Sequence, residues 1–202
     1  MFNAFAKATV TKDNASILSK AVQELSNLDV LVGIPEDTAE RKDQKDDKIN
    51  NAELAYIHTH GVRSLPMRKE MEESIKKGKT YGKALQMYIK EHGSPLWHVP
   101  PRPIIEPAIE DEVNREIIVD DLKKAAEAAL DGDERKTRDE LTKAGLDAQN
   151  MVRDWFENPK NEWPPNAEAT IKQKGSDMPL IDTGELRKSI TYVIRNKGEA
   201  ND

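Results

Sequence analysis

The sequence predicts an α+β fold: a small, mainly antiparallel sheet packed by a long helix, with a long helical hairpin and a helical insertion. Apolar residues recur at helical spacing from Ile104 to Leu130 and again from residue 134 to about Asn158. Residues 29–34 are apolar at nearly every position, and residues 188–196 alternate between apolar and polar, which is typical of strands. With 202 residues the chain can bury a sizeable core, so we expect one α+β domain over residues 1–202.

The first predicted element is an amphipathic helix from Asn14 to Leu28, with apolar side chains every three or four residues. The strand at residues 29–34 follows, and its nearly continuous apolar character indicates a central place in the sheet. Pro35 ends this strand because proline has no N–H group for a further ladder bond. Residues 36–48 then hold ten charged residues among thirteen. This composition predicts a mobile loop, either solvated or ordered only against a neighbouring subunit.

Residues 65–95 are predicted to form a helical insertion that projects from the main fold. A helix-prone stretch at residues 70–77 is broken by Gly78, and Thr80 can cap a second helix. Gly93 and Pro95 end the excursion. The apolar stripe of the second helix either folds back on the core or contacts another subunit; it consists of Tyr81, Leu85, Tyr88 and Ile89.

The long helical hairpin has the strongest periodic signal. Its joint is predicted at Asp131-Gly132-Asp133, where Gly132 suits a left-handed C-cap and Asp133 an N-cap. Because the joint is short, the two helices should lie antiparallel, with small residues allowing close approach. Both apolar stripes are expected to pack in the core, with a subunit contact as the alternative. The small residues are Ala144, Gly145 and Ala148, and the first helix carries Ile105, Ile109, Val113, Ile117, Leu122, Ala126 and Ala129.

The C-terminal block combines a Trp163-Pro164-Pro165 segment with a short helix and a strand. Asp182 is predicted to cap the helix, and Glu185, three residues on, to complete a capping box. Leu186 and Ile190 supply its apolar face before the alternating strand begins. This is a structural signature that requires no catalytic group.

The same block resembles the minor virion proteins of tailed bacteriophages, the tail-completion, neck and virion-morphogenesis proteins. The resemblance rests on a Trp-Pro pair, on Thr170 and Lys172 downstream, and on Leu-x-x-Thr-Gly-x-Leu-x-x-Ser-Ile at residues 180–190. Three further segments are similar to that group, in the same order along the chain: 30–34, 52–61 and 99–108, the last with Ile104 in place of the usual Phe. Residues 62–97 have no counterpart.

This resemblance implies a structural subunit of a ring that joins the tail to the head. Its partners would be copies of itself and neighbouring tail-tube or neck proteins, with DNA passing through the lumen without specific binding. The protein would be made in the host bacterial cytoplasm and reside in the virion. The residues expected to fix its architecture are Arg102, Pro103, Ile105, Trp163, Pro164, Leu180, Thr183, Gly184, Leu186 and Ile190.

Composition excludes several other classes. No apolar run approaches the ~20 residues that span a bilayer, and we expect no membrane contact. The chain has no Cys, which removes disulfides and thiolate metal sites. A net charge of −6 disfavours a general nucleic-acid binder, which needs a basic face.

Two enzymatic classes and one scaffolding class are alternatives to the structural role. Residues 180–184 resemble the active-site turn of retroviral-type aspartic proteases, which would need a dimer that pairs two copies of Asp182 in an all-β frame. A metal enzyme could use His58 and His60 together with His92 and His98 as ligands. Residues two apart on a helix point to nearly opposite sides, which hinders joint ligation by His58 and His60, and no Cys supports them. We therefore expect no catalytic residue, metal or cofactor. The remaining alternative is a small scaffolding module that acts by helix pairing.

Overall fold

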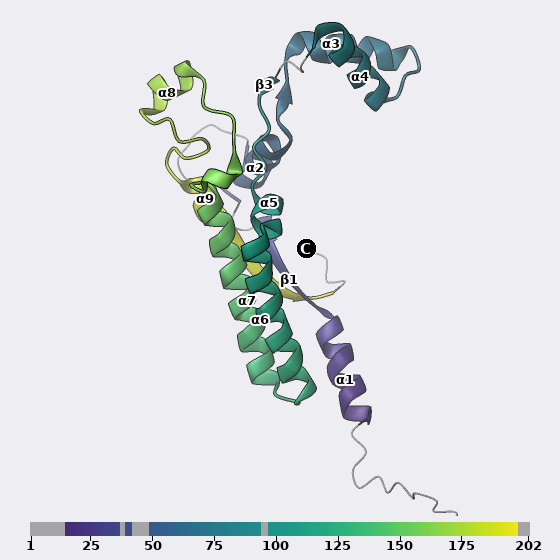
Figure 1. Cartoon of the computed structure of the whole chain (residues 1–202), viewed down its shortest axis with the longest axis vertical. Coiled ribbons are helices and arrows are strands. Elements are labelled where there is room, and N and C mark those ends of the chain that lie inside the picture. The colour runs from purple at the N-terminus through teal and green to yellow at the C-terminus, as the bar shows by residue number, and fades with distance from the viewer. Residues whose placement is uncertain (1–14, 37–38, 42–48, 94–96, 198–202) are drawn as a thin grey trace, which may run out of the picture.

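The computed structural model describes residues 15–36, 39–41, 49–93 and 97–197. Most of the predicted mobile loop at residues 36–48 lies outside these ranges. The described chain is α+β, as predicted, and extended in shape, with a long helical hairpin at its centre (Figure 1). Its helices are α1 (Ala15–Ser26), α2 (Asn51–His60), α3 (Leu65–Lys76), α4 (Tyr81–His92), α5 (Ile105–Glu110), α6 (Glu112–Leu130), α7 (Glu134–Trp155), α8 (Glu168–Lys174) and α9 (Glu185–Ser189). Its strands are β1 (Leu28–Gly33), β2 (Val62–Arg63), β3 (Trp97–Val99) and β4 (Thr191–Asn196).

The central hairpin consists of α6 and α7, which run side by side in opposite directions (Figure 1). The predicted joint is confirmed. Gly132 has φ +78°, a conformation that favours glycine, and the Asp133 carboxylate accepts a hydrogen bond from the Lys136 N–H at 2.9 Å. These two residues stop one helix and start the next with only a tight turn between them.

The predicted continuous helix from Ile104 to Leu130 is wrong, because the chain breaks at Asp111. This residue has φ −52° and ψ 130°, outside the helical region, and separates α5 from α6. Polar contacts hold the break: the Asn114 amide donates to the Ala108 carbonyl at 2.8 Å, and Lys160 donates to the Asp111 carboxylate at 2.6 Å. Hydrophobic periodicity carries no information about such contacts.

The predicted packing face of α6 is also wrong, because the residues that are buried each precede a predicted residue by one position in the sequence. The buried residues are Asp121, Ala125 and Ala128, whereas Leu122 is 40% exposed. Asp121 forms an ion pair with Lys143 of α7, which identifies this side as the one that faces the hairpin partner. Alanines on this side allow close helix approach, so the larger apolar side chains of α6 are turned away from α7.

The sheet pairs β1 with β4 in antiparallel register, from Leu28 opposite Asn196 to Gly33 opposite Thr191. Among the described residues it has only these two strands, so the prediction that residues 29–34 are central in their sheet is wrong. The sheet packs on α7, not on the helix near residues 104–130 as predicted. Gly145 of α7 explains the close fit: a Cβ there would lie 2.3 Å from the Tyr192 ring of β4. This glycine therefore makes room for the sheet, and not for α6 as predicted.

The main core lies where the C-terminal end of α7 meets α5 and α9. It is built from aromatic and aliphatic side chains that come from distant parts of the sequence. Its buried members are Ile104, Ala108, Val152, Trp155, Phe156, Trp163, Leu186 and Ile190. The C-terminal block and the segment before α5 therefore share one core.

The insertion at residues 65–95 is a helical hairpin, α3 and α4, carried on the β2–β3 pair at the end of the molecule opposite α1 (Figure 1). Gly78 lies in the turn and the Thr80 hydroxyl caps α4, as predicted. The hairpin has its own small core of Met67, Met71, Ala84 and Tyr88. Its apolar stripe thus packs partly within the hairpin and does not fold back on the main core, while Tyr81 remains 56% exposed.

Replacing residues 65–95 with a short Gly/Ser linker should leave a cooperatively folded domain. The hairpin core is separate from the main core, and β2 and β3 already bring the two cut ends together, with Val62 opposite Val99. Thermal unfolding followed by circular dichroism tests this. Loss of all cooperative unfolding would mean that the hairpin belongs to the main folding unit.

Candidate functional site

Arg102 joins two segments that lie sixty residues apart in the sequence. Its side chain is only 5% exposed, and its Nε and Nη2 atoms donate to the Pro164 carbonyl at 2.9 and 2.8 Å. Nη2 also donates to the Pro165 carbonyl at 2.9 Å. The Arg102 backbone N–H donates to the His58 carbonyl at 2.6 Å, which attaches the end of α2 to the same point. One buried guanidinium thus organises three chain segments.

Trp163 reinforces this junction from the other side. Its Nε1–H donates to the Pro103 carbonyl at 3.0 Å, and its ring meets Phe156 edge-on with centroids 5.7 Å apart. The predicted residues Arg102, Pro103, Trp163 and Pro164 therefore form a single cluster, which we call the Arg102 junction. Ile105, at the start of α5, packs against the adjoining core.

The other predicted residues surround α9. Leu186 and Ile190 are buried in the main core, and Leu180 packs against it with φ +59°, which is unusual for a leucine. Gly184, with φ +80°, occupies the N-cap position of α9. The Thr183 hydroxyl accepts a hydrogen bond from the Glu185 N–H at 3.4 Å.

Asp182 does not cap α9, so the predicted capping box with Glu185 is wrong. The N-cap residue is Gly184, which has no side chain, and no side-chain cap bond is formed there. The left-handed conformation of Gly184 moves the start of the helix past Asp182. The Asp182 side chain is exposed instead, and its charge acts on Lys174.

Substitution of Asp182 by Asn and by Ala should have equal and small effects, within about 0.5 kcal/mol of the wild-type free energy of unfolding. An aspartate that caps a helix would behave differently, because Asn replaces it well and Ala costs about 1 kcal/mol. Urea denaturation of both variants distinguishes these cases. Peptide cleavage by the wild type that disappears in Asp182→Asn would instead favour the protease alternative.

Arg153 of α7 was not predicted from the sequence. Its guanidinium donates to the Ile190 carbonyl at 2.7 and 3.1 Å and to the Lys188 carbonyl at 3.1 Å, so it fixes the passage from α9 into β4. The sequence pattern did not indicate this role, because an arginine next to the apolar face of a helix has the same pattern when it is simply exposed to solvent.

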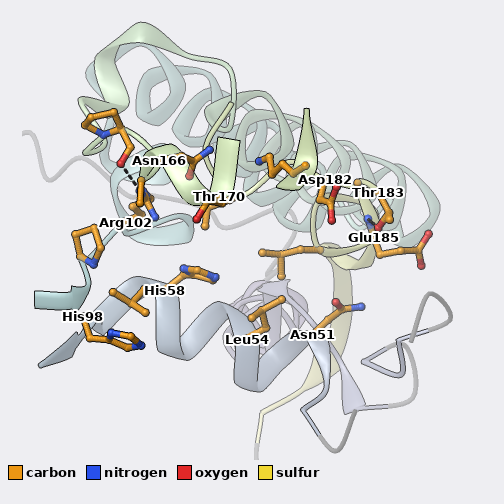
Figure 2. Close-up of a pocket in the computed structure, with 18 of the residues that line it drawn as sticks. Asn51, Leu54, His58, His98, Arg102, Asn166, Thr170, Asp182, Thr183 and Glu185 are labelled. Carbon is orange, nitrogen blue, oxygen red and sulfur yellow. Dashed lines mark hydrogen bonds between the residues drawn. The ribbon is translucent and has the colours of Figure 1, made fainter. Parts of the chain in front are cut away.

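A pocket of about 540 Å³ opens beside the Arg102 junction, between α2 and the segment from Pro165 to Leu186 (Figure 2). Asn51, Leu54 and His58 of α2 contribute to it at spacings of three and four, which places them on one helical face. Thr170 and Lys174 of α8 contribute from the facing segment. The pocket is elongated along α2, with Arg102 and His58 toward one end and Asn51 toward the other (Figure 2).

Two titratable groups in the pocket have shifted pKa values, and two buried polar atoms have no hydrogen-bond partner among the described residues. Burial, and then the positive charge of Arg102, lower the pKa of His58 to about 4, so its imidazole is neutral at pH 7. Burial also lowers the pKa of Lys174, with Asp182 acting in the opposite direction. Asn51 is 1% exposed, and neither its Oδ1 atom nor His58 Nδ1 has a hydrogen-bond partner among the described residues.

The pocket offers donors, acceptors and charged groups around one hollow, which is the chemistry that a ligand site requires.

A second cluster of polar side chains lies on the α3–α4 hairpin. Ligand atoms of Glu70, Glu91 and His92 lie within 4.8 Å of one another, and His92 Nε2 is 2.9 Å from the Glu70 carboxylate. These three residues could hold a metal ion, although His92 already has a partner. Of these three residues only His92 was a candidate ligand from the sequence, because Glu70 meets the other two only after α3 and α4 pack together.

Comparison with known proteins gives no relative for this chain. No protein-family model matches it, and no curated protein or solved structure matches it either. None of the helices in the described ranges combines the length and the apolar character needed to cross a membrane.

Proposed function

We propose that this protein is a structural subunit of a tailed-bacteriophage virion, in the neck or tail-completion ring that joins the tail to the head. It binds copies of itself and neighbouring tail-tube or neck proteins, and it has no catalytic role. The Arg102 junction brings together two of the sequence segments that resemble this group. They are residues 99–108 and the block that begins at Trp163. Their joint role in the architecture supports treating them as parts of one motif.

The observation that carries the proposal is a set of uncovered apolar side chains on α6 and on α1, which packs beside it. On α6, Ile117 is 42% and Val113 56% exposed, and on α1 Val22 is 51% exposed. A contiguous group of exposed apolar side chains is typical of protein–protein interfaces. On α6, Val113 and Ile117 lie one turn apart on the same face. The other exposed apolar residues of the two helices are Leu18, Val22, Val119, Leu122 and Leu130, and those of α6 lie on other faces of the helix.

The outer face of the sheet gives a second observation. Leu31 and Val193 lie opposite each other in the β1–β4 register, and each is 39% exposed. Each strand pairs with one other strand among the described residues. An exposed apolar cross-strand pair on such a two-stranded sheet is a surface that a neighbouring subunit could cover.

The isolated protein should be a monomer or weak oligomer in dilute solution and should form a ring when tails or necks are present. The net charge of −6 gives mutual repulsion that delays self-association. Closure of a ring requires one surface to fit a different surface on the next copy. The ring lumen should be acidic or neutral, so that DNA passes without binding. Mass measurement over a concentration series, with and without purified tails, tests this.

Ile117→Lys should prevent ring formation in the same assay, whereas Ile75→Lys should not. The two isoleucines are a matched pair, since they are 42% and 41% exposed, on α6 and on α3 respectively. Burying the charge of the new lysine costs free energy only at a position that a neighbouring subunit covers, so only a substitution in the subunit interface should prevent assembly. A tight dimer that forms regardless of tails would contradict the ring and favour the scaffolding module.

A further inference from the structure

Two carboxylates and one imidazole meet on the surface of the α3–α4 hairpin. Glu70 comes from the middle of α3, whereas Glu91 and His92 come from the last turn of α4. One ligand atom of each residue lies within 4.8 Å of the other two. The imidazole is held in place by the ring of Tyr88, a member of the buried hairpin core, with ring centroids 4.4 Å apart. Three ligand groups from two helices are therefore close enough to share one ion.

The cluster has an excess of negative charge. Neither carboxylate forms an ion pair with a lysine or arginine in the part of the chain that the structure describes. The partner of Glu70 is His92, whose Nε2 atom lies 2.9 Å from Oε2 and 3.1 Å from Oε1 of that carboxylate. A protonated imidazole supplies at most one positive charge to the two carboxylates. The cluster is therefore negative in either state of the imidazole, and a divalent cation would neutralise it.

The donor atoms select the class of cation. Mg²⁺ and Ca²⁺ prefer sites made of oxygen ligands alone, whereas an imidazole nitrogen is a preferred ligand of Zn²⁺ and neighbouring transition metals. Zn²⁺ commonly takes three protein ligands from His and Glu plus a water molecule, with bonds of about 2.0–2.2 Å. Ligand atoms around such a tetrahedral ion lie about 3.4 Å apart, and a small rotation of the exposed Glu91 side chain achieves this spacing.

We propose that Glu70, Glu91 and His92 bind one Zn²⁺ ion, or a transition-metal ion of the same ligand preference, which ties α3 to α4. The ion takes the place of the proton that lies between Glu70 and His92, and water completes its coordination. The described part of the hairpin has a buried core of only four residues, and so small a unit gains stability from a bound metal. This inference goes beyond the proposed virion role and does not depend on it.

Titration of the isolated protein with zinc chloride, followed by NMR of the histidine side chains, tests the proposal. We expect saturable shifts of His92 with one ion bound per chain. Hydrogen exchange should become slower in α3 and α4 but not in α7, because the ion stabilises only the unit that it binds. Mg²⁺ and Ca²⁺ should bind at least about tenfold more weakly. Binding at millimolar zinc only, which is an adventitious ion only, or unchanged exchange in the hairpin would overturn the proposal.

Substitutions of single ligands identify the site. His92→Gln and Glu91→Gln should each weaken Zn²⁺ binding at least about tenfold. The matched controls are His98→Gln and Glu73→Gln, because both side chains are exposed and neither belongs to the cluster. The controls should leave the affinity unchanged within about twofold. Equal effects of a cluster variant and its control would overturn the proposed site. The ring assay needs no zinc, so the two proposals fail separately.

Discussion

Replacing Arg102 with methionine should lower the free energy of unfolding by about 3 kcal/mol. Methionine retains much of the apolar stem but leaves the Pro164 and Pro165 carbonyls without their three hydrogen bonds. Hydrogen bonds that involve a charged group contribute more than neutral ones, and a carbonyl left buried without a donor carries a further cost. Urea denaturation of the variant measures the loss.

Arg138→Met is the control for this experiment, because Arg138 is exposed on α7. Its replacement should change the free energy of unfolding by less than about 0.5 kcal/mol. Arg102→Lys should fall between the two, since an ammonium group cannot reproduce the planar fork that spans both carbonyls. If Arg102→Met were as stable as Arg138→Met, the junction would not hold the two segments together.

Gly145→Ala should destabilise the fold by about 2 kcal/mol, although alanine favours a helix by about 1 kcal/mol. The new Cβ would lie 2.3 Å from Tyr192 Cδ2 and under 3.0 Å from two further ring atoms, so the strand or the helix must move. Gly82→Ala in α4 is the matched control, because a Cβ there meets nothing within 4 Å. That variant should be stabilised by about 0.5 kcal/mol.

A double-mutant cycle separates the clash from other effects. In a Tyr192→Ala background the ring is gone, so Gly145→Ala should change sign and stabilise the helix by up to about 1 kcal/mol. The free energies of unfolding of the four proteins give the coupling directly. Additive effects of the two substitutions would show that Gly145 and Tyr192 do not contact each other.

Features that depend on near neighbours in the chain were predictable. The turn at Gly132 and Asp133, the break at Gly78 and the cap at Thr80 each follow from one or two residues whose backbone preferences act locally. The β1 and β4 segments were recognisable for the same reason, because alternation or continuous apolar character is a local pattern. Several residues that matter for architecture, such as Arg102, Trp163 and Leu186, were also identified, although through resemblance and not through geometry.

The sequence by itself determined the fold class, the helical insertion and the positions of most helix ends. Only the tertiary structure decided which faces meet: that α6 presents Ala125 and not Ala126, that Gly145 serves the sheet, and that Gly184 displaces Asp182 from the cap. The pocket likewise depends on contacts between distant residues, since Arg102 binds both the end of α2 and the Pro164–Pro165 segment. The physical reason is that periodicity defines a stripe to within one position, about 100° of helix rotation, and says nothing about polar contacts between distant residues.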